Sequence, residues 1–175
     1  PSPIESAIAN GDESTGISIM SLTAKMDAGP VYHQVEFNLP KYETSPHLSQ
    51  KLATLAATEL MAALPRIFDG SLKPTPQDES KATYCQLITK ADAKLNPSAH
   101  TAEQAERLVR AYKAFPRARL TIAGQDIIIL QAHLSATQTS PLDIPFKDGV
   151  LSIDELIAPS GKTMTAGAFI KGYLK

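Results

Sequence analysis

The sequence predicts an α/β segment followed by a small β domain, whose strands we expect to form an OB-like barrel. Three observations predict this order. Residues 1–70 alternate helical and strand patterns, residues 71–83 are rich in Pro and polar residues, and residues 84–175 hold several short strand patterns separated by Gly turns. We therefore expect two parts, residues 1–70 and 84–175, joined by an extended linker over residues 71–83.

The first part is expected to contain a helix, two strands and a long helix, over residues 3–10, 16–22, 31–39 and 45–70. Pro3 in the first turn favours the first helix. Apolar residues recur three and four apart from Leu48 to Leu64, which predicts a wide apolar helix face against a sheet. Two strands and one covering helix cannot bury a core alone. We therefore expect the first half of this domain to precede Pro1.

The second part is expected to begin with a helix over residues 101–112, because Thr101 and Gln104 are spaced as a capping box. Gly124-Gln125 is typical of a tight turn between two strands. The expected strands and final helix lie at residues 119–123, 126–134 and 149–153, around Leu156, and at residues 165–173.

The composition excludes several classes of protein. With 43% hydrophobic and 20% charged residues, the chain is typical of a soluble globular protein. No apolar run reaches the roughly 18 residues that span a bilayer, so no membrane is expected. The single cysteine, Cys85, excludes an intrachain disulfide and a cysteine-based metal cluster. The four histidines show no metal-ligand spacing, and we expect no metal and a cytoplasmic location.

Charge is distributed unevenly between the two parts. Residues 1–82 carry 6 Lys and Arg against 10 Asp and Glu, whereas residues 83–175 carry 11 against 8. A positive second part suits a polyanionic partner. Its basic candidates are Arg107, Arg110, Lys113, Arg117, Arg119 and Lys162. The first three share one helical face, which is either an ordinary solvated face or a stripe that contacts phosphates.

Several motifs point to one family. The run from Pro3 to Met20, followed by Met26-Asp27-Ala28-Gly29, resembles the second half of the catalytic domain of the methionyl-tRNA formyltransferase family. Residues 77–84 and 87–90 resemble the segment that joins the two domains of that family. Asp148–Ile153 and Ser160–Met164 resemble its C-terminal barrel. The resemblance weakens at Asn96-Pro97 and at residues 112–116.

The resemblance implies a doubly wound, Rossmann-like formyltransferase domain that ends near residue 70. It implies transfer of a formyl group from 10-formyltetrahydrofolate to the amine of initiator methionyl-tRNA, in translation initiation. The family's catalytic Asp matches Asp27. Its Asn, its His and its folate loop would precede Pro1, so no cofactor-binding residue is expected here and the chain alone should be inactive. His33 is not expected to replace that His. We expect a monomer.

Three other interpretations stay open at this point. A sugar-nucleotide N-formyltransferase or a formyltetrahydrofolate hydrolase-type enzyme would share the Asp27 region without needing a basic barrel. A non-catalytic RNA-binding or oligomerisation module would not need half of an α/β domain. Lys162 lies in a Ser-Gly-Lys-Thr turn that lacks the upstream glycine of a phosphate loop, so nucleotide binding is not expected there.

Overall fold

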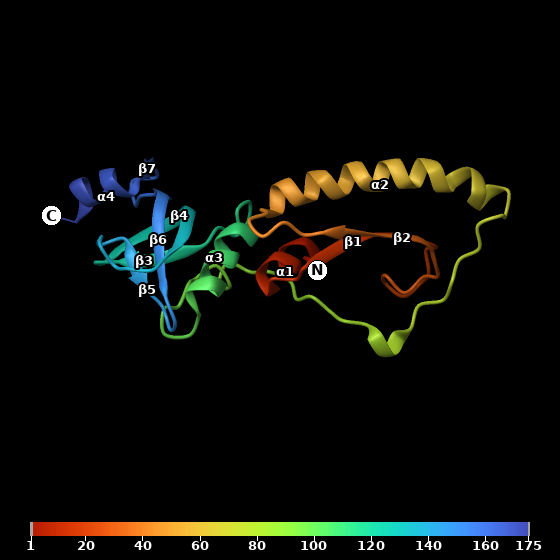
Figure 1. Cartoon of the computed structure of the whole chain (residues 1–175), viewed down its shortest axis with the longest axis horizontal. Helices are drawn as coiled ribbons and strands as arrows, with labels where there is room; N and C mark the ends of the chain where they lie inside the picture. The colour runs from red at the N-terminus through yellow and green to blue at the C-terminus, as the bar shows by residue number, and fades with distance from the viewer. Residues whose placement is uncertain (1, 175) are drawn as a thin grey trace.

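The computed structural model describes residues 2–174 and is elongated, with one group of elements at each end (Figure 1). The first group contains α1 (Pro3–Asn10), β1 (Ser14–Met20), β2 (Val31–Asn38) and α2 (Ser45–Phe68). The second contains α3 (Ala102–Ala111), β3 (Arg119–Ile122), β4 (Gln125–Ser135), β5 (Asp143–Pro145), β6 (Val150–Ile157), β7 (Thr163–Thr165) and α4 (Ala166–Tyr173). The helices and strands expected in the first part are confirmed, with small shifts at their ends.

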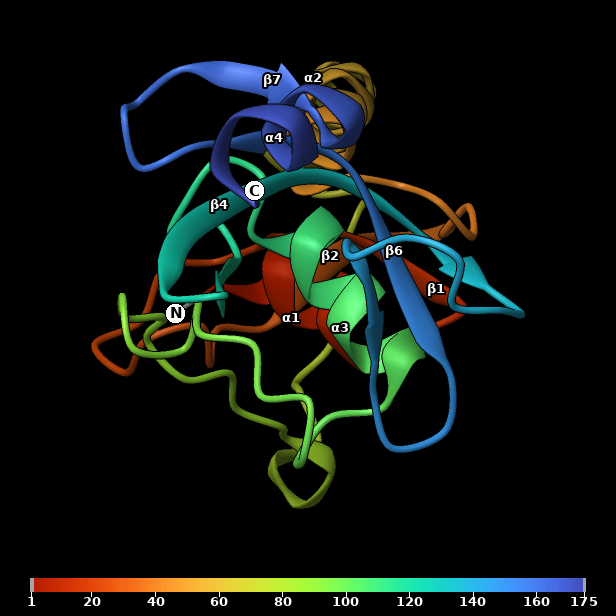
Figure 2. The same ribbon diagram turned by 90° about the vertical axis from the view of Figure 1, so that its left-hand side faces the viewer.

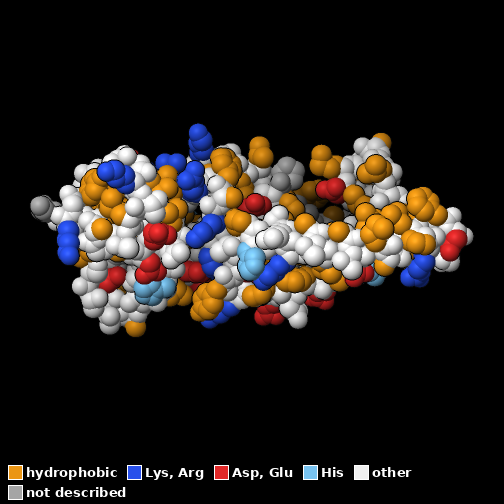
Figure 3. All heavy atoms as spheres, turned by 90° about the horizontal axis from the view of Figure 1, so that it is seen from above, with side chains coloured by type: hydrophobic (Ala, Val, Ile, Leu, Met, Phe, Trp, Pro, Cys, Tyr) orange, Lys and Arg blue, Asp and Glu red, His pale blue; other side chains and the backbone are white. Residues whose placement is uncertain are grey.

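Strands β1 and β2 form an antiparallel pair, and α2 packs along it (Figure 1). The helix α2 continues through Pro65, as expected, and ends at Phe68 before the turn at Asp69. Leu48 and Leu52 are buried, whereas Met61 and Phe68 are 70% and 83% exposed. Seen from above, hydrophobic side chains gather over the half of the molecule that contains α2 (Figure 3).

The chain after α2 returns beneath β1 and β2 to reach α3 (Figure 1). From residue 73 to residue 89 this stretch is extended apart from one 3₁₀ turn, η1 (Glu79–Lys81), and further turns follow at residues 90–93 and 97–99. It is also attached to the sheet, because Val31 and Thr75 exchange two backbone hydrogen bonds of 2.8 Å. The linker, residues 71–83, is therefore also bound to the sheet, because Thr75 forms an antiparallel bridge with Val31 at the start of β2.

The second group is built on an antiparallel sheet in the order β3-β4-β6-β5, with β7 also paired to β6. Two strand predictions need correction. Residues 149–153 and the stretch around Leu156 form one continuous strand, β6, and the short strands β5 and β7 were not expected. Figure 2 shows β4 and β6 curving around α3. The sheet is a curled half-barrel whose OB-like arrangement stays a prediction.

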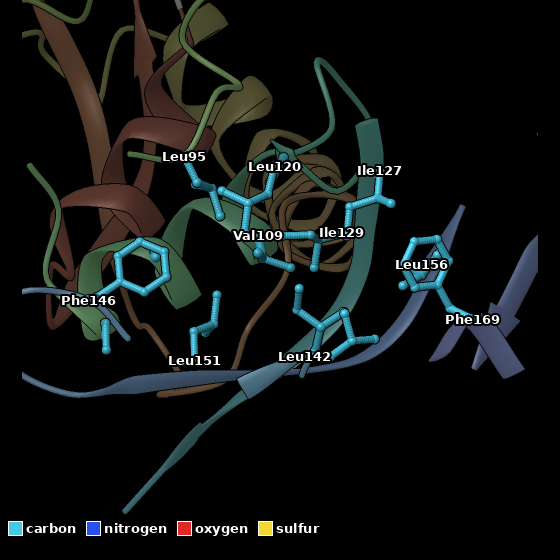
Figure 4. Packing of buried hydrophobic residues seen from close by; sticks show 14 of the residues in the cluster. Leu95, Val109, Leu120, Ile127, Ile129, Leu142, Phe146, Leu151, Leu156 and Phe169 are labelled. Carbon is cyan, nitrogen blue, oxygen red and sulfur yellow. The ribbon is translucent and has the colours of Figure 1, made fainter. Parts of the chain in front are cut away.

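A hydrophobic core fills the concave side of this sheet. Val109 of α3 lies among Leu120, Ile129 and Leu151 from three strands, and Phe169 of α4 packs near Leu156 (Figure 4). The expected capping box starts α3, because the Thr101 hydroxyl accepts from the Gln104 N–H and the Gln104 side chain accepts from the Thr101 N–H. The capping box thereby fixes where α3 begins, and Val109 packs the helix against the sheet.

The helix α3 also joins the two groups of elements. Ala111 and Tyr112 are buried in a second cluster with Ile8, Leu48 and Leu52. The helix α3 therefore has two apolar faces, and the one at its C-terminal end packs against residues of α1 and α2. The apolar side chains buried between the two groups of elements fix the position of one group relative to the other.

Candidate functional site

Asp27 lies in the connection between β1 and β2, residues 21–30, which we call the Asp27 loop. The loop is closed at its base, because the Ser21 N–H donates to the Pro30 carbonyl at 2.9 Å. Gly29 is required at this closure, since a Cβ atom there would stand 1.7 Å from the Ser21 carbonyl oxygen. The local sequence thus folds back on itself and presents its central residues to solvent.

Asp27 adopts φ of 55°, in the left-handed region, where Asp is one of the few tolerated residues other than Gly. Its side chain is exposed. Within residues 2–174 no hydrogen bond or ion pair engages its carboxylate, although its backbone carbonyl accepts a hydrogen bond from Gln77. The carboxylate is therefore available to a group that approaches the loop.

Asp27 lines an open hollow of about 1000 Å³ between the loop, β2 and the linker. On one side the hollow is lined by Thr75–Glu79 and by residues 81–85, in the linker and just after it. Lys25 of the Asp27 loop, which also lines the hollow, forms an ion pair with Glu79. This hydrogen-bonded carboxylate raises the pKa of the Lys25 ammonium above its ordinary value. The lining of the hollow thus contains two ion pairs, Lys25–Glu79 and Lys81–Asp78, and the Asp27 carboxylate, which has no partner among residues 2–174.

His33 also lines this hollow but already has a partner. Its Nε2 lies 2.9 Å from Oε2 of Glu59, so that β2 is tied to α2. The arrangement suits the expectation that His33 is structural, which stays a prediction. Residues 2–174 bring together no group of three His, Cys, Asp or Glu side chains that could hold a metal ion.

Of the six predicted basic residues, Arg107, Arg110 and Lys113 make intramolecular side-chain contacts. Arg110 forms a two-point ion pair with Glu106, at 2.7 and 2.9 Å, and its Nη1 donates to the Glu43 carbonyl at 2.8 Å. Arg107 pairs with Glu103 at 2.7 Å. The acidic partners lie four residues before each Arg, a spacing visible in the sequence that indicates helical ion pairs.

The remaining basic residues are placed apart from one another. The Lys113 ammonium donates to the Leu130 carbonyl at 2.8 Å, so it supports β4. Arg117 and Lys162 are exposed. Arg119, at the start of β3, is exposed as well. The six predicted basic residues do not form one patch, and the exposed residues Arg117 and Lys162 have the greater freedom to meet a partner.

The described helices include none that is long and apolar enough to cross a membrane. The fold is an open α/β half with an exposed carboxylate on a loop, followed by a domain built on a curled antiparallel sheet. Two family descriptions match: "Formyl transferase" over residues 1–64 and "Formyl transferase, C-terminal domain" over residues 87–174. The chain belongs to the formyltransferase family, as the sequence predicted.

Curated relatives agree with this family, and solved structures share the fold. A methionyl-tRNA formyltransferase from Lactobacillus acidophilus is 37% identical over 97% of this chain and 58% of its own length. HypX from Aquifex aeolicus in complex with tetrahydrofolic acid superimposes with a TM-score of 0.76 at 17% identity, covering 100% of this chain and 33% of that one. An N-formyltransferase from Helicobacter canadensis, in complex with folinic acid and dTDP-3-aminofucose, gives 0.69 at 16% identity over 85% of this chain and 58% of its own.

Proposed function

We propose that this chain is the C-terminal part of an enzyme that formylates the amine of initiator methionyl-tRNA, with 10-formyltetrahydrofolate as donor, in the cytoplasm during translation initiation. Support comes from the name of the relatives that match most of the chain. The chain spans about 58% of the length of the Lactobacillus relative. The carrying observation is Asp27, a carboxylate without a partner among residues 2–174, exposed on a loop closed by hydrogen bonds.

The chemistry explains why such a carboxylate matters. The amine must lose a proton as its nitrogen attacks the formyl carbon, and negative charge develops on the formyl oxygen. A carboxylate next to an imidazole fixes its orientation and favours its charged form. Asp27 would do this for the His that the resemblance places before Pro1. The same proposal assigns residues 1–70 to the catalytic domain, 71–83 to the linker and 84–175 to an OB-like domain.

The exposed apolar side chains of α2 fit this division. Leu60, Met61 and Phe68 are 40%, 70% and 83% exposed, which is unusual for one helix of a complete domain. A larger α/β sheet, of which β1 and β2 are one edge, would cover such residues. The exposed basic residues Arg117 and Lys162 of the second part are the proposed contacts to tRNA phosphates, and the enzyme acts as a monomer.

The test is formyl transfer by the longer protein that contains residues 1–175, with Asp27→Asn as the variant. Asn keeps the shape but cannot stabilise an imidazolium, so we expect the rate on methionyl-tRNA to fall by at least about 100-fold. Glu36→Gln, which neutralises an exposed carboxylate of β2 outside the lining of the hollow, is the matched control. Undiminished transfer by Asp27→Asn would remove Asp27 from the mechanism.

One structural neighbour favours a second candidate acceptor, an amino group on a sugar nucleotide, because that N-formyltransferase was solved with dTDP-3-aminofucose. The two candidates differ in what the β domain must do, since only a tRNA presents many phosphates to it. The same assay with a dTDP-amino sugar in place of methionyl-tRNA separates them. Faster transfer to the sugar would reject tRNA as the substrate.

A further inference from the structure

The linker residue Gln77 contacts the Asp27 loop from 50 residues away in the sequence. Its side-chain amide nitrogen, Nε2, donates to the carbonyl oxygen of Asp27 at 2.8 Å and to that of Gly29 at 2.7 Å. A primary amide has two N–H groups, so it can satisfy both acceptors at once. Gln77 therefore holds the peptide that follows Asp27 and the carbonyl group at the end of the loop.

Two neighbouring contacts make this attachment continuous. Thr75 pairs with Val31 through two backbone hydrogen bonds just after the loop, and Glu79 pairs with Lys25 just before Asp27. Gln77 lies between Thr75 and Glu79. Of these three linker residues, Gln77 alone has a side chain that contacts the backbone of Asp27. The linker thus contacts the second half of the Asp27 loop, at Lys25, Asp27 and Gly29, and the first residue of β2 directly after it.

The loop needs such support because it has little of its own. Residues 22–27 are exposed, and a left-handed φ at a residue other than Gly persists only where its surroundings enforce it. A catalytic side chain must be held within about 0.5 Å of its productive position. Hydrogen bonds on both sides of Asp27 would supply that restraint without burying its carboxylate.

We propose that Gln77 is a positioning residue for Asp27, and that the linker residues Thr75–Glu79 serve as a clamp on the Asp27 loop. This inference rests on the proposed function, in which Asp27 takes part in formyl transfer. Gln77 acts through the backbone of Asp27 and touches no reacting atom. Its removal should therefore lower the turnover number and leave the binding of the formyl donor unchanged.

The decisive variants change the donor while keeping the size of the side chain. Gln77→Glu replaces the amide donor by a carboxylate oxygen that would face two carbonyl oxygens. Gln77→Lys keeps N–H donors at the end of a chain of similar length. Gln50→Glu makes the same change as Gln77→Glu at an exposed position on α2, and so controls for the added charge. All are made in the longer protein that contains residues 1–175.

We expect Gln77→Glu to lower kcat by about 100-fold, the loss that a 1 Å misplacement can cause. KM for 10-formyltetrahydrofolate and the urea midpoint should stay as in the parent protein, and Gln77→Lys should restore part of kcat. If the carboxylate unfolds the protein, Gln77→Ala removes the donor without adding charge and carries the same expectation.

The double variant identifies the route of the effect. If Gln77 acts through Asp27, then Asp27→Asn with Gln77→Glu is no slower than Asp27→Asn alone. Losses that multiply in the double variant, or a kcat for Gln77→Glu equal to that of Gln50→Glu, overturn the inference. Full activity of Asp27→Asn refutes the proposed function instead, so the two failures are distinguishable.

Discussion

The guanidinium of Arg107 occupies the space in which any residue other than Gly at position 11 would carry its Cβ atom. Its Cζ lies 2.2 Å from that position, and its Nη1 donates to the Asn10 carbonyl at 3.2 Å. A cation thus covers the C-terminal end of α1, where helix carbonyls carry partial negative charge. One contact joins the first group of elements to α3, and it leaves room only for Gly at position 11.

Gly11→Ala should therefore destabilise the protein more than the same substitution at a left-handed glycine that has free space around it. Gly11 has φ of 76° and Gly161 has φ of 80°, but nothing lies within 4 Å of a Cβ atom at Gly161. Gly161→Ala should cost only the backbone strain, about 1 kcal/mol. Gly11→Ala should cost about 2 kcal/mol, because Arg107 must also leave its place. Urea unfolding measures both, and equal losses would contradict the role of Arg107.

Arg110→Ala should be more damaging than the loss of an exposed cation. The side chains of Arg110 and Glu106 are only 14% and 8% exposed, so the variant leaves a buried carboxylate without its partner. Breaking a buried pair in this way costs about 3 kcal/mol. Arg117→Ala, at an exposed position, is the control and should cost under about 0.5 kcal/mol. A small loss for Arg110→Ala would show that the pair is dispensable to the junction between the two groups.

Local signals in the sequence predicted much of this fold. Thr101 and Gln104 indicated the start of α3, and the Gly124 turn indicated the β3–β4 hairpin, because caps and tight turns depend on adjacent residues. The short strands β5 and β7 escaped prediction. Each has three residues and is defined by its pairing with β6, a contact that no local pattern records.

The candidate site was only partly predictable for the same reason. Asp27 was found through a family motif, whereas the contact of Gln77 with it joins residues 50 apart. The possible phosphate-contacting stripe of Arg107, Arg110 and Lys113 was inferred from helical spacing alone. Glu103 and Glu106, four residues before Arg107 and Arg110, carried the missing information, because that spacing favours ion pairs within the helix over contacts with a partner.

The proposed tRNA contacts of the second part can be tested by salt dependence. Each phosphate contact that is lost should reduce the slope of log affinity against log salt by about 0.9 on duplex regions. Replacing both Arg117 and Lys162 by Ala should therefore raise the tRNA dissociation constant and reduce the slope by up to about 2. Lys73→Ala, at an exposed position outside this part, is the control. An unchanged slope in the double variant would place the tRNA surface elsewhere.

The carboxylate of Asp143 should make the stability of the β domain depend on pH. Its carboxylate accepts hydrogen bonds from the Ser152 hydroxyl at 2.6 Å and from the Thr139 and Ser140 N–H groups, each at 2.8 Å. The Ser152 hydroxyl, followed by these N–H groups, holds the pKa of Asp143 below its ordinary value of 3.8. The unfolded chain binds a proton first as pH falls. The stabilisation is therefore complete above about pH 5 and is lost as pH falls through the lower, folded-state pKa.

Ser152→Ala tests this dependence directly. The variant removes the largest cause of the lowered pKa, so it should cost about 2 kcal/mol at pH 7 and progressively less as the pH falls through the lowered, folded-state pKa of Asp143. Ser45→Ala is a matched control, because Ser45 is also buried and its hydroxyl has no partner within residues 2–174. Urea unfolding from pH 7 to pH 2.5 should show a loss that shrinks with acidity for Ser152→Ala and stays constant for Ser45→Ala. A loss for Ser152→Ala that is the same at every pH would mean that the hydroxyl stabilises the fold by packing and not through the Asp143 charge.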